Sequence, residues 1–104
     1  MRVAVVGAGA VGARAARQLA SSADVDAVVV HETDIERQGA VLAGLTDERS
    51  ERGVRPLTDD GLRAVVLACP AGDHGRRAVE LVAAGIHVVS VSDDLGDVRE
   101  LLAL

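Results

Sequence analysis

The stretch that decides the fold is VAVVGAGAVGARAARQL, residues 3–19. It runs from an apolar, β-branched segment through three glycines into an alanine-rich segment. The near-continuous apolar run at residues 2–6 predicts a strand that is buried on both faces. The alanine-rich run predicts a helix over residues 10–21. The glycines therefore stand where a buried strand turns into a helix.

The three glycines, Gly7, Gly9 and Gly12, have the spacing G-x-G-x-x-G. In a β-α-β unit the first glycine of this pattern turns the chain sharply. The second leaves room for a pyrophosphate, and the third lets the helix pack close to the strand. We expect the amides of Gly9, Ala10, Val11 and Gly12 to face the phosphates at the positive end of the helix. The spacing alone is weak evidence, but the strand before it and the helix after it are the context that the pattern requires.

The pattern also requires an acid about 20 residues further on, at the end of the second strand. Residues 26–31 predict that strand, and Glu32 follows it directly. A carboxylate there accepts hydrogen bonds from the adenosine ribose and opposes a 2′-phosphate. Thr33 stands where an NADP site usually has an arginine, although Arg14 or Arg37 could reach a 2′-phosphate. The sequence thus predicts a nicotinamide dinucleotide site that favours NAD over NADP. The alternative is a tight turn in an unrelated doubly wound domain, with a solvated Glu32.

Strands and helices alternate along the rest of the chain, which predicts a parallel sheet with right-handed crossovers. Further strands are predicted over residues 63–68 and 86–91, with a short one near Gly53–Arg55 in the polar segment 46–61, and further helices over residues 35–44, 73–84 and 95–103. The expected fold class is α/β, a Rossmann-type doubly wound parallel sheet of about five strands. Residues 1–104 are predicted to be one dinucleotide-binding domain. Because the full fold needs more chain, we expect a truncated domain whose substrate domain lies outside this sequence.

Polar residues and glycine mark the predicted helix ends. Thr33 or Asp34 is expected to cap the helix over residues 35–44, and Asp73 the helix after the fourth strand. Gly85 is expected to end that helix, since glycine is favoured just past a helix C-terminus. Ser92 is expected to cap the last helix.

The segment ACPAGDH, residues 68–74, follows a predicted strand at the carboxyl edge of the sheet, where ligands bind in such folds. Pro70 fixes the turn. Cys69 could face the nicotinamide, or act as a small apolar residue. His74 could hydrogen-bond the cofactor or substrate, or only pack in the first turn of its helix. These three residues complete the predicted cofactor-binding set, and no catalytic residue is assigned.

Composition excludes several classes of function. The formal net charge of −5 and the absence of Phe, Tyr and Trp argue against nucleic-acid binding. One cysteine excludes an internal disulfide, and the three scattered histidines lack ligand spacing, so no metal is predicted. The chain has no lysine to act as a catalytic base. The first residues do not show the pattern of a signal peptide, and no apolar run approaches the ~20 residues that span a membrane, so the expected location is the cytoplasm.

The chain resembles the N-terminal nucleotide-binding domain of the saccharopine dehydrogenase-like NAD(P)-dependent oxidoreductases over nearly its whole length. The resemblance rests on VAVVGAGAVGARAARQLA (residues 3–20), VVVHETD (residues 28–34) and AGIHVVSVSDD (residues 84–94). The first of these segments is generic to many dehydrogenases. The last has a helix-ending glycine that leads into a strand with a polar end, and it is moderately specific to this family.

A second resemblance overlaps the first. ACPAGDHGRRAVELVAAGIHVV, residues 68–89, is similar to the central stretch of the glucose–fructose oxidoreductase and inositol dehydrogenase family. There, a proline after the fourth strand is followed four residues later by histidine, as Pro70 and His74 are. That family then carries Glu-Lys-Pro with a catalytic lysine, whereas this chain has Val91-Ser92-Asp93. This departure favours the saccharopine dehydrogenase-like group.

Both resemblances imply an oxidoreductase that acts on a small amino-acid-like, hydroxy or amino substrate, held largely by a second domain. We therefore expect this chain alone to catalyse nothing. We also expect it to self-associate as a homodimer through the apolar face of Leu95, Val98, Leu101 and Leu102. The alternatives are a non-enzymatic NAD(H)-sensing regulatory domain, like those of potassium-uptake systems, and a fold that binds a sugar nucleotide or methyl donor. The regulatory domains typically carry Gly-Asp-Ala or Gly-Asp-Pro after the third strand, and VRPLTDDG (residues 54–61) has neither.

Overall fold

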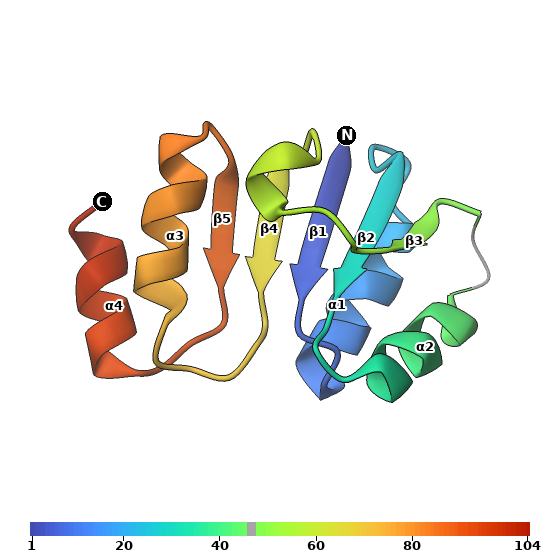
Figure 1. Ribbon diagram of the computed structural model, residues 1–104, viewed down its shortest axis with the longest axis horizontal. Helices are drawn as coiled ribbons and strands as arrows, with labels where there is room; N and C mark the ends of the chain where they lie inside the picture. The colour runs from blue at the N-terminus through green and yellow to red at the C-terminus, as the bar shows by residue number, and fades with distance from the viewer. Residues whose placement is uncertain (46–47) are drawn as a thin grey trace.

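A computed structural model describes residues 1–45 and 48–104, so Thr46 and Asp47 of the polar segment lie outside the described residues. One parallel sheet forms the centre, with helices on both faces (Figure 1). In chain order the elements are β1 (Arg2–Val6), α1 (Ala10–Ala20), β2 (Ala27–His31), α2 (Ile35–Gly44), β3 (Ser50–Arg52), a 3₁₀ turn (Leu57–Asp59), β4 (Ala64–Leu67), α3 (His74–Ala83), β5 (His87–Ser90) and α4 (Leu95–Leu102).

The strand order is β3-β2-β1-β4-β5, and every pairing is parallel. The arrowheads of β1, β2, β4 and β5 therefore point to the same edge of the sheet (Figure 1). From β1 the chain builds outward to β2 and β3, then crosses back to the other side of β1 for β4 and β5. This order is that of a doubly wound sheet, in which ligands bind where the winding direction reverses. The predicted α/β fold class and five-stranded sheet are confirmed.

The continuous apolar runs of β1 and β2 are explained by helices on both faces of the sheet. Successive strand residues point to opposite faces, so each run supplies two cores. One core packs against α1 and contains Val3, Val5, Val28, Val30, Ala16 and Ala20. The other packs against α3 and contains Ala4, Val6, Val29, Val65, Leu67 and Leu81. No described helix is long and apolar enough to cross a membrane.

The C-terminus of α3 ends as predicted, at Gly85. Its φ of +79° lies in the left-handed region that side chains disfavour. The Gly85 amide donates to the Val82 carbonyl at 3.0 Å, and the Ile86 amide donates to the Leu81 carbonyl at 2.9 Å. These two bonds make a Schellman motif, and Ile86 and Leu81 share the second core. The glycine thus ends the helix and directs the chain into β5.

The start of α2 settles one prediction between its two alternatives. Asp34, and not Thr33, is the N-cap: its carboxylate accepts hydrogen bonds from the Glu36 and Arg37 amides at 3.0 and 3.2 Å. The Thr33 hydroxyl instead donates to the Glu32 carboxylate at 3.3 Å. Thr33 therefore belongs to the end of β2 rather than to the helix.

Two other predicted caps are wrong. Asp73 stands at the N-cap position of α3, but its ψ of 11° is not extended and its side chain accepts no amide hydrogen. The carboxylate accepts a hydrogen bond from the Arg77 side chain at 3.0 Å instead. Ser92 does not cap α4; Asp94 does, accepting from the Asp97 amide at 3.0 Å. Both cap positions depend on backbone angles that residue type alone does not fix.

The third strand lies earlier than predicted. It spans Ser50–Arg52, whereas the expectation was a strand near Gly53–Arg55. Its residues are polar, and long-range side-chain contacts hold it. Arg2 of β1 makes two hydrogen bonds of 2.9 Å to the Glu51 carboxylate. Arg52 donates to the buried Gln38 amide oxygen of α2 at 2.7 Å. These contacts cannot be inferred from local strand propensity, which is why the prediction missed the position.

Candidate dinucleotide-binding site

The first and third glycines of the turn are required by close packing. Gly7 has a φ of +105°, and a Cβ added there would lie 2.7 Å from backbone atoms of Ala68 and Cys69. A Cβ on Gly12 would lie 1.9 Å from the Gly7 carbonyl oxygen. The turn is thus pressed against the end of β4 on one side and against α1 on the other.

Gly9 is different, because the space in front of it is open. A Cβ added at Gly9 would meet nothing within 4 Å. Gly9 is the N-cap of α1, so no side chain caps the helix, and the first turn holds no acid. The free amides of a helix N-terminus carry partial positive charge and bind phosphate groups. An open, uncapped helix end beside a glycine turn fits the diphosphate of a nicotinamide dinucleotide.

Glu32 joins the end of β2 to the glycine turn. One carboxylate oxygen accepts a hydrogen bond from the Ala8 amide at 2.8 Å, and the other accepts from the Asp34 amide at 3.1 Å. These backbone hydrogen bonds, that of Ala8 first, hold the pKa of Glu32 below its ordinary value, so the carboxylate stays ionised. An ionised carboxylate has about four acceptor positions. The oxygen bound to Ala8 therefore retains one for a ribose hydroxyl.

A crevice of about 390 Å³ opens between the glycine turn and the ends of β2, β3 and β4. It brings together five predicted site residues: Gly7, Glu32, Thr33, Cys69 and Pro70. It is also lined by residues that the sequence analysis did not assign to the site, namely Val6, His31, Gly53, Arg55, Pro56, Leu57 and Arg77. The crevice lies at the carboxyl edge where the strand order reverses, which is the expected place for a ligand.

His74 is predicted to lie at the site, and the structure places it just behind. It is 0% exposed and does not line the crevice. Its Nε2 lies 2.8 Å from the Cys69 carbonyl oxygen, and its Nδ1 lies 2.7 Å from the Ser90 hydroxyl. A carbonyl only accepts, so Nε2 carries the hydrogen and Nδ1 accepts from Ser90. Both ring nitrogens therefore hold the Cys69–Pro70 turn to β5.

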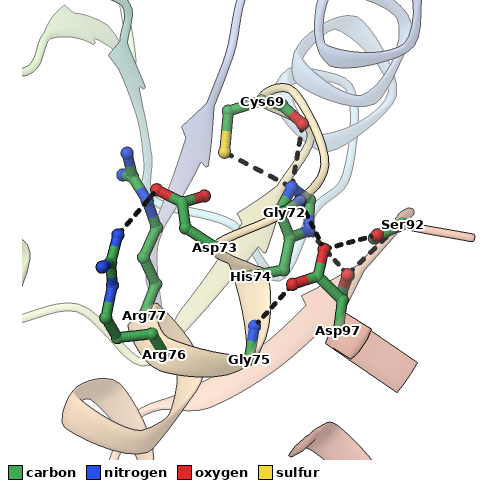
Figure 2. Close-up of polar contacts among 10 residues, drawn as sticks. Cys69, Gly72, Asp73, His74, Gly75, Arg76, Arg77, Ser92 and Asp97 are labelled. Atoms are coloured by element: carbon green, nitrogen blue, oxygen red, sulfur yellow. Dashed lines mark hydrogen bonds and ion pairs between the residues drawn. The ribbon is translucent and has the colours of Figure 1, made fainter. Parts of the chain in front are cut away.

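Asp97 is an organising residue that the sequence analysis missed. Only 1% exposed, it reaches from α4 to the start of α3, where it accepts hydrogen bonds from the Gly72 and Gly75 amides at 2.8 and 3.3 Å (Figure 2). The Ser92 hydroxyl donates to it at 2.6 Å. That bond above all, with the Gly72 amide, lowers the pKa of Asp97 to about 2. The N-terminus of α3 is thus occupied by the protein's own carboxylate, whereas that of α1 is open.

One group among the described residues could hold a metal ion by geometry. Ligand atoms of Cys69, Asp73 and His74 all lie within 4.8 Å of one another. His74 and Asp73 already have partners, because His74 bonds to Ser90 and to the Cys69 carbonyl, and Asp73 pairs with Arg77. Burial raises the pKa of the Cys69 thiol, which disfavours the thiolate that would bind a metal. The expectation of no metal stays a prediction.

The family of the chain follows from a comparison of its sequence with protein-family models. Residues 1–92 match the model of the GFO/IDH/MocA group, described as an oxidoreductase family with an NAD-binding Rossmann fold. The chain belongs to this family. Of the two sequence resemblances, the second, to the glucose–fructose oxidoreductase and inositol dehydrogenase family, is the one that this match supports. As an NAD-binding domain of the GFO/IDH/MocA family, the chain binds a nicotinamide dinucleotide, as predicted.

Solved structures of similar fold include dehydrogenases with chains longer than this one. GenD2 from gentamicin A biosynthesis, in complex with NAD, is 30% identical with a TM-score of 0.75 over 99% of this chain and 30% of its own. The WlbA dehydrogenase of Bordetella pertussis, with NADH and UDP-GlcNAcA, is 25% identical with a TM-score of 0.72, over 99% and 31%. The myo-inositol 2-dehydrogenase of Lactobacillus plantarum shares the fold at 21% identity and a TM-score of 0.75, over 99% and 32%.

This GFO/IDH/MocA chain therefore spans about a third of the length of these solved structures. No curated protein matches it in a sequence comparison.

Proposed function

We propose that this chain holds NAD for an oxidoreductase, with Gly7, Gly9 and Gly12 beneath the diphosphate and Glu32 on the adenosine ribose. The open space at Gly9, in front of the uncapped N-terminus of α1, carries the proposal. The bound nicotinamide supplies hydride-transfer chemistry. The residues of this chain bind the dinucleotide and orient it, and the amides of Ala10 and Val11 belong to the diphosphate site.

NAD is proposed as the preferred cofactor because of the charges near the end of β2. Glu32 is ionised and stands where a 2′-phosphate would approach. Thr33 donates its hydroxyl to Glu32 and so does not offer it to a phosphate. The Arg37 side chain lies 3.7 Å from the Asp34 carboxylate, which partly neutralises it. These contacts support discrimination against NADP.

Three residues after β4 are assigned different parts. Cys69 and Pro70 line the crevice that also contains Glu32, so we assign them to the adenosine end of the cofactor and not to the nicotinamide. His74, fully buried, is assigned to the support of that turn. Its contact with the cofactor would be indirect, through the position of the Cys69 backbone.

The whole protein is proposed to transfer hydride to or from a small substrate with hydroxyl or amino groups, held by a second domain. The solved structures named above include one dehydrogenase of myo-inositol and one dehydrogenase in complex with UDP-GlcNAcA. These favour a sugar or cyclitol over the amino-acid-like substrate that the saccharopine dehydrogenase resemblance implies. An NAD(H)-sensing regulatory role is the second candidate, which the match to an oxidoreductase family disfavours. A cytoplasmic location and a homodimer remain proposals.

Replacing Gly9 with valine tests the proposal. The substitution adds side-chain atoms to open space in front of α1, so it should block the diphosphate without disturbing the fold. A matched control is Gly39→Val in α2, where an added Cβ also meets nothing within 4 Å. Calorimetry should find NAD binding in the unmodified chain and in Gly39→Val, and affinity lower by roughly 100-fold or more in Gly9→Val, a loss of about 2.7 kcal/mol. Equal affinity in all three proteins, or no binding by the unmodified chain, would refute it.

A further inference from the structure

We propose that Arg77 is the residue that stacks on the adenine base of the cofactor, with its guanidinium plane set by Asp73. The inference rests on the proposed function, because it needs the dinucleotide to bind with its diphosphate at the glycine turn. It adds a binding residue from α3, outside the glycine turn and the end of β2.

The contents of the crevice indicate which end of the dinucleotide it receives. A carboxylate at the end of β2 bonds to the ribose of the adenosine half, and Glu32 lines the crevice. The base attached to that ribose therefore enters the same crevice. Arg77, from α3, also lines it, together with Cys69 and Pro70, which follow β4.

The base needs a flat partner, and this chain has few. It contains no Phe, Tyr or Trp, so no aromatic ring of that kind can stack on adenine. The planar groups that line the crevice are those of His31, Arg55 and Arg77. The His31 ring already packs against the backbone of Gly53, where an added Cβ would lie 2.5 Å from it. An arginine guanidinium is planar and stacks on the face of a base.

Of the two arginines, Arg77 is the better placed. Its Nε donates to the Asp73 carboxylate (Figure 2) at a distance of 3.0 Å. Its side chain is 43% exposed. Arg55 is 69% exposed and lies 3.8 Å from Asp60, beyond hydrogen-bond distance. Hydrogen bonds of a guanidinium lie in its plane, so the bond to Asp73 restrains the side chain at its edge and does not occupy its face. Less side-chain entropy is then lost when a base stacks on Arg77.

Arg76 provides a natural control, because it shares the same ion-pair partner without facing the crevice. It lies 3.6 Å from the Asp73 carboxylate and its side chain is 77% exposed. It lines a separate hollow with Val79 and Glu80 instead. The variants Arg77→Met and Arg76→Met therefore remove the same charge and each removes an ion pair with Asp73, but only the first removes a wall of the crevice.

The experiment measures the binding of three probes to the chain: NAD, ADP and nicotinamide mononucleotide, the last of which lacks adenine. Calorimetry gives the affinities. Because the chain has no aromatic residue of its own that absorbs near 260 nm, the loss of adenine absorbance on stacking can be followed directly with ADP. The proteins compared are the unmodified chain, Arg77→Met, Arg77→Lys, Arg76→Met and Arg55→Met, each checked for folding by circular dichroism.

Arg77→Met should bind NAD and ADP about two- to five-fold more weakly and show less loss of adenine absorbance, with the mononucleotide unaffected. Lysine keeps the charge but not the plane, so Arg77→Lys should not restore the absorbance change. Arg76→Met, outside the crevice, should behave as the unmodified chain, and Arg55→Met should keep the loss of adenine absorbance. Full rescue by lysine would mean that Arg77 binds a phosphate through its charge. Equal behaviour of Arg77→Met and Arg76→Met would mean that Arg77 contacts neither the adenine nor a phosphate. Either result overturns the inference. If the unmodified chain binds none of the probes, the proposed function fails as well.

Discussion

Glu32 has two tasks, and its position between β2 and the glycine turn accounts for both. Its carboxylate accepts a hydrogen bond from the Ala8 amide at 2.8 Å and so stabilises the conformation of the glycine turn without a ligand. The same hydrogen bonds keep it ionised, and a fixed negative charge near the ribose opposes a 2′-phosphate. One side chain thus connects the shape of the turn to the choice of cofactor.

Replacing Glu32 with glutamine should therefore weaken NAD binding and narrow the difference between NAD and NADP. Glutamine keeps one oxygen acceptor but loses the charge, so we expect the ratio of the two dissociation constants to fall by about ten-fold, or about 1.4 kcal/mol. Glu36→Gln, four residues away on the exposed first turn of α2, is the control and should leave the ratio unchanged. An unmodified chain that binds NADP more tightly than NAD would contradict the assignment.

At the scale of elements, two glycines have similar open space around them, yet replacing each of them should change the stability of the fold in opposite directions. An added Cβ meets nothing within 4 Å at either Gly85 or Gly39, so packing does not distinguish them. Gly85 ends α3 with a φ of +79°, whereas Gly39 lies inside α2. Only the backbone conformation differs.

Alanine at these two positions should change stability in opposite directions. Gly85→Ala should lower the free energy of unfolding by about 1–2 kcal/mol, since a side chain disfavours the left-handed region. Gly39→Ala should raise it by about 0.5–1 kcal/mol, because alanine loses less backbone entropy in a helix. Urea unfolding measures both. A stabilising Gly85→Ala would show that α3 does not end in this conformation.

The joint between α3 and α4 depends on one carboxylate. Asp97 has a pKa of about 2, below its ordinary value of 3.8, because Ser92 and the α3 amides bond to its charged form. A carboxyl whose pKa is lowered in the folded state stabilises the protein above its unfolded pKa. That stability is lost as the pH falls from about 4 to 2.

Asp97→Asn should consequently reduce the melting temperature at pH 7, and the difference from the unmodified chain should shrink as the pH falls from 4 toward 2. Asparagine cannot supply the charge that the Gly72 and Gly75 amides and Ser92 share. Asp93→Asn, an exposed neighbour, is the control and should show no such convergence. A difference in melting temperature that stays constant over this pH range would exclude the assigned role.

At the scale of the molecule, ligand contacts converge on one edge of the sheet from elements that are distant in the chain. The glycine turn follows β1, Glu32 follows β2, and Arg77 lies on α3 beyond β4. All three line or border the same crevice. A ligand that bridges them binds the folded chain and has little affinity for the unfolded one.

NAD should therefore stabilise the whole molecule. At a concentration one hundred times its dissociation constant, it should raise the free energy of unfolding by about 2.7 kcal/mol and the melting temperature by about 12 °C. At the same NAD concentration Gly9→Val should shift by about 2 °C or less, while melting near the unmodified chain without ligand. A thermal scan with and without NAD measures this, and an equal shift in the Gly9→Val variant would place the ligand elsewhere.

The sequence by itself determined the elements whose signal is local. The apolar runs predicted β1 and β2, the alternation of strands and helices predicted the doubly wound sheet, and the φ-sensitive position of Gly85 was marked by its residue type. The site was predictable where spacing encodes chemistry. Gly7, Gly12 and Glu32 stand at fixed intervals because one turn and one strand separate them, and those lengths vary little in such folds.

Only the tertiary structure decided the contacts between distant segments. In β3, Glu51 bonds to Arg2, 49 residues away, and Arg52 bonds to Gln38, 14 residues away. The position of β3 therefore depends on side chains that no local pattern includes. Asp97 accepts a hydrogen bond from the Gly72 amide, 25 residues earlier in the chain. The sequence around Asp97 is that of an ordinary surface helix. The physical reason is the same in each case. Hydrogen bonds and burial depend on distance in space, and the distance in space between groups so far apart in the chain is set by the whole fold and not by any local pattern.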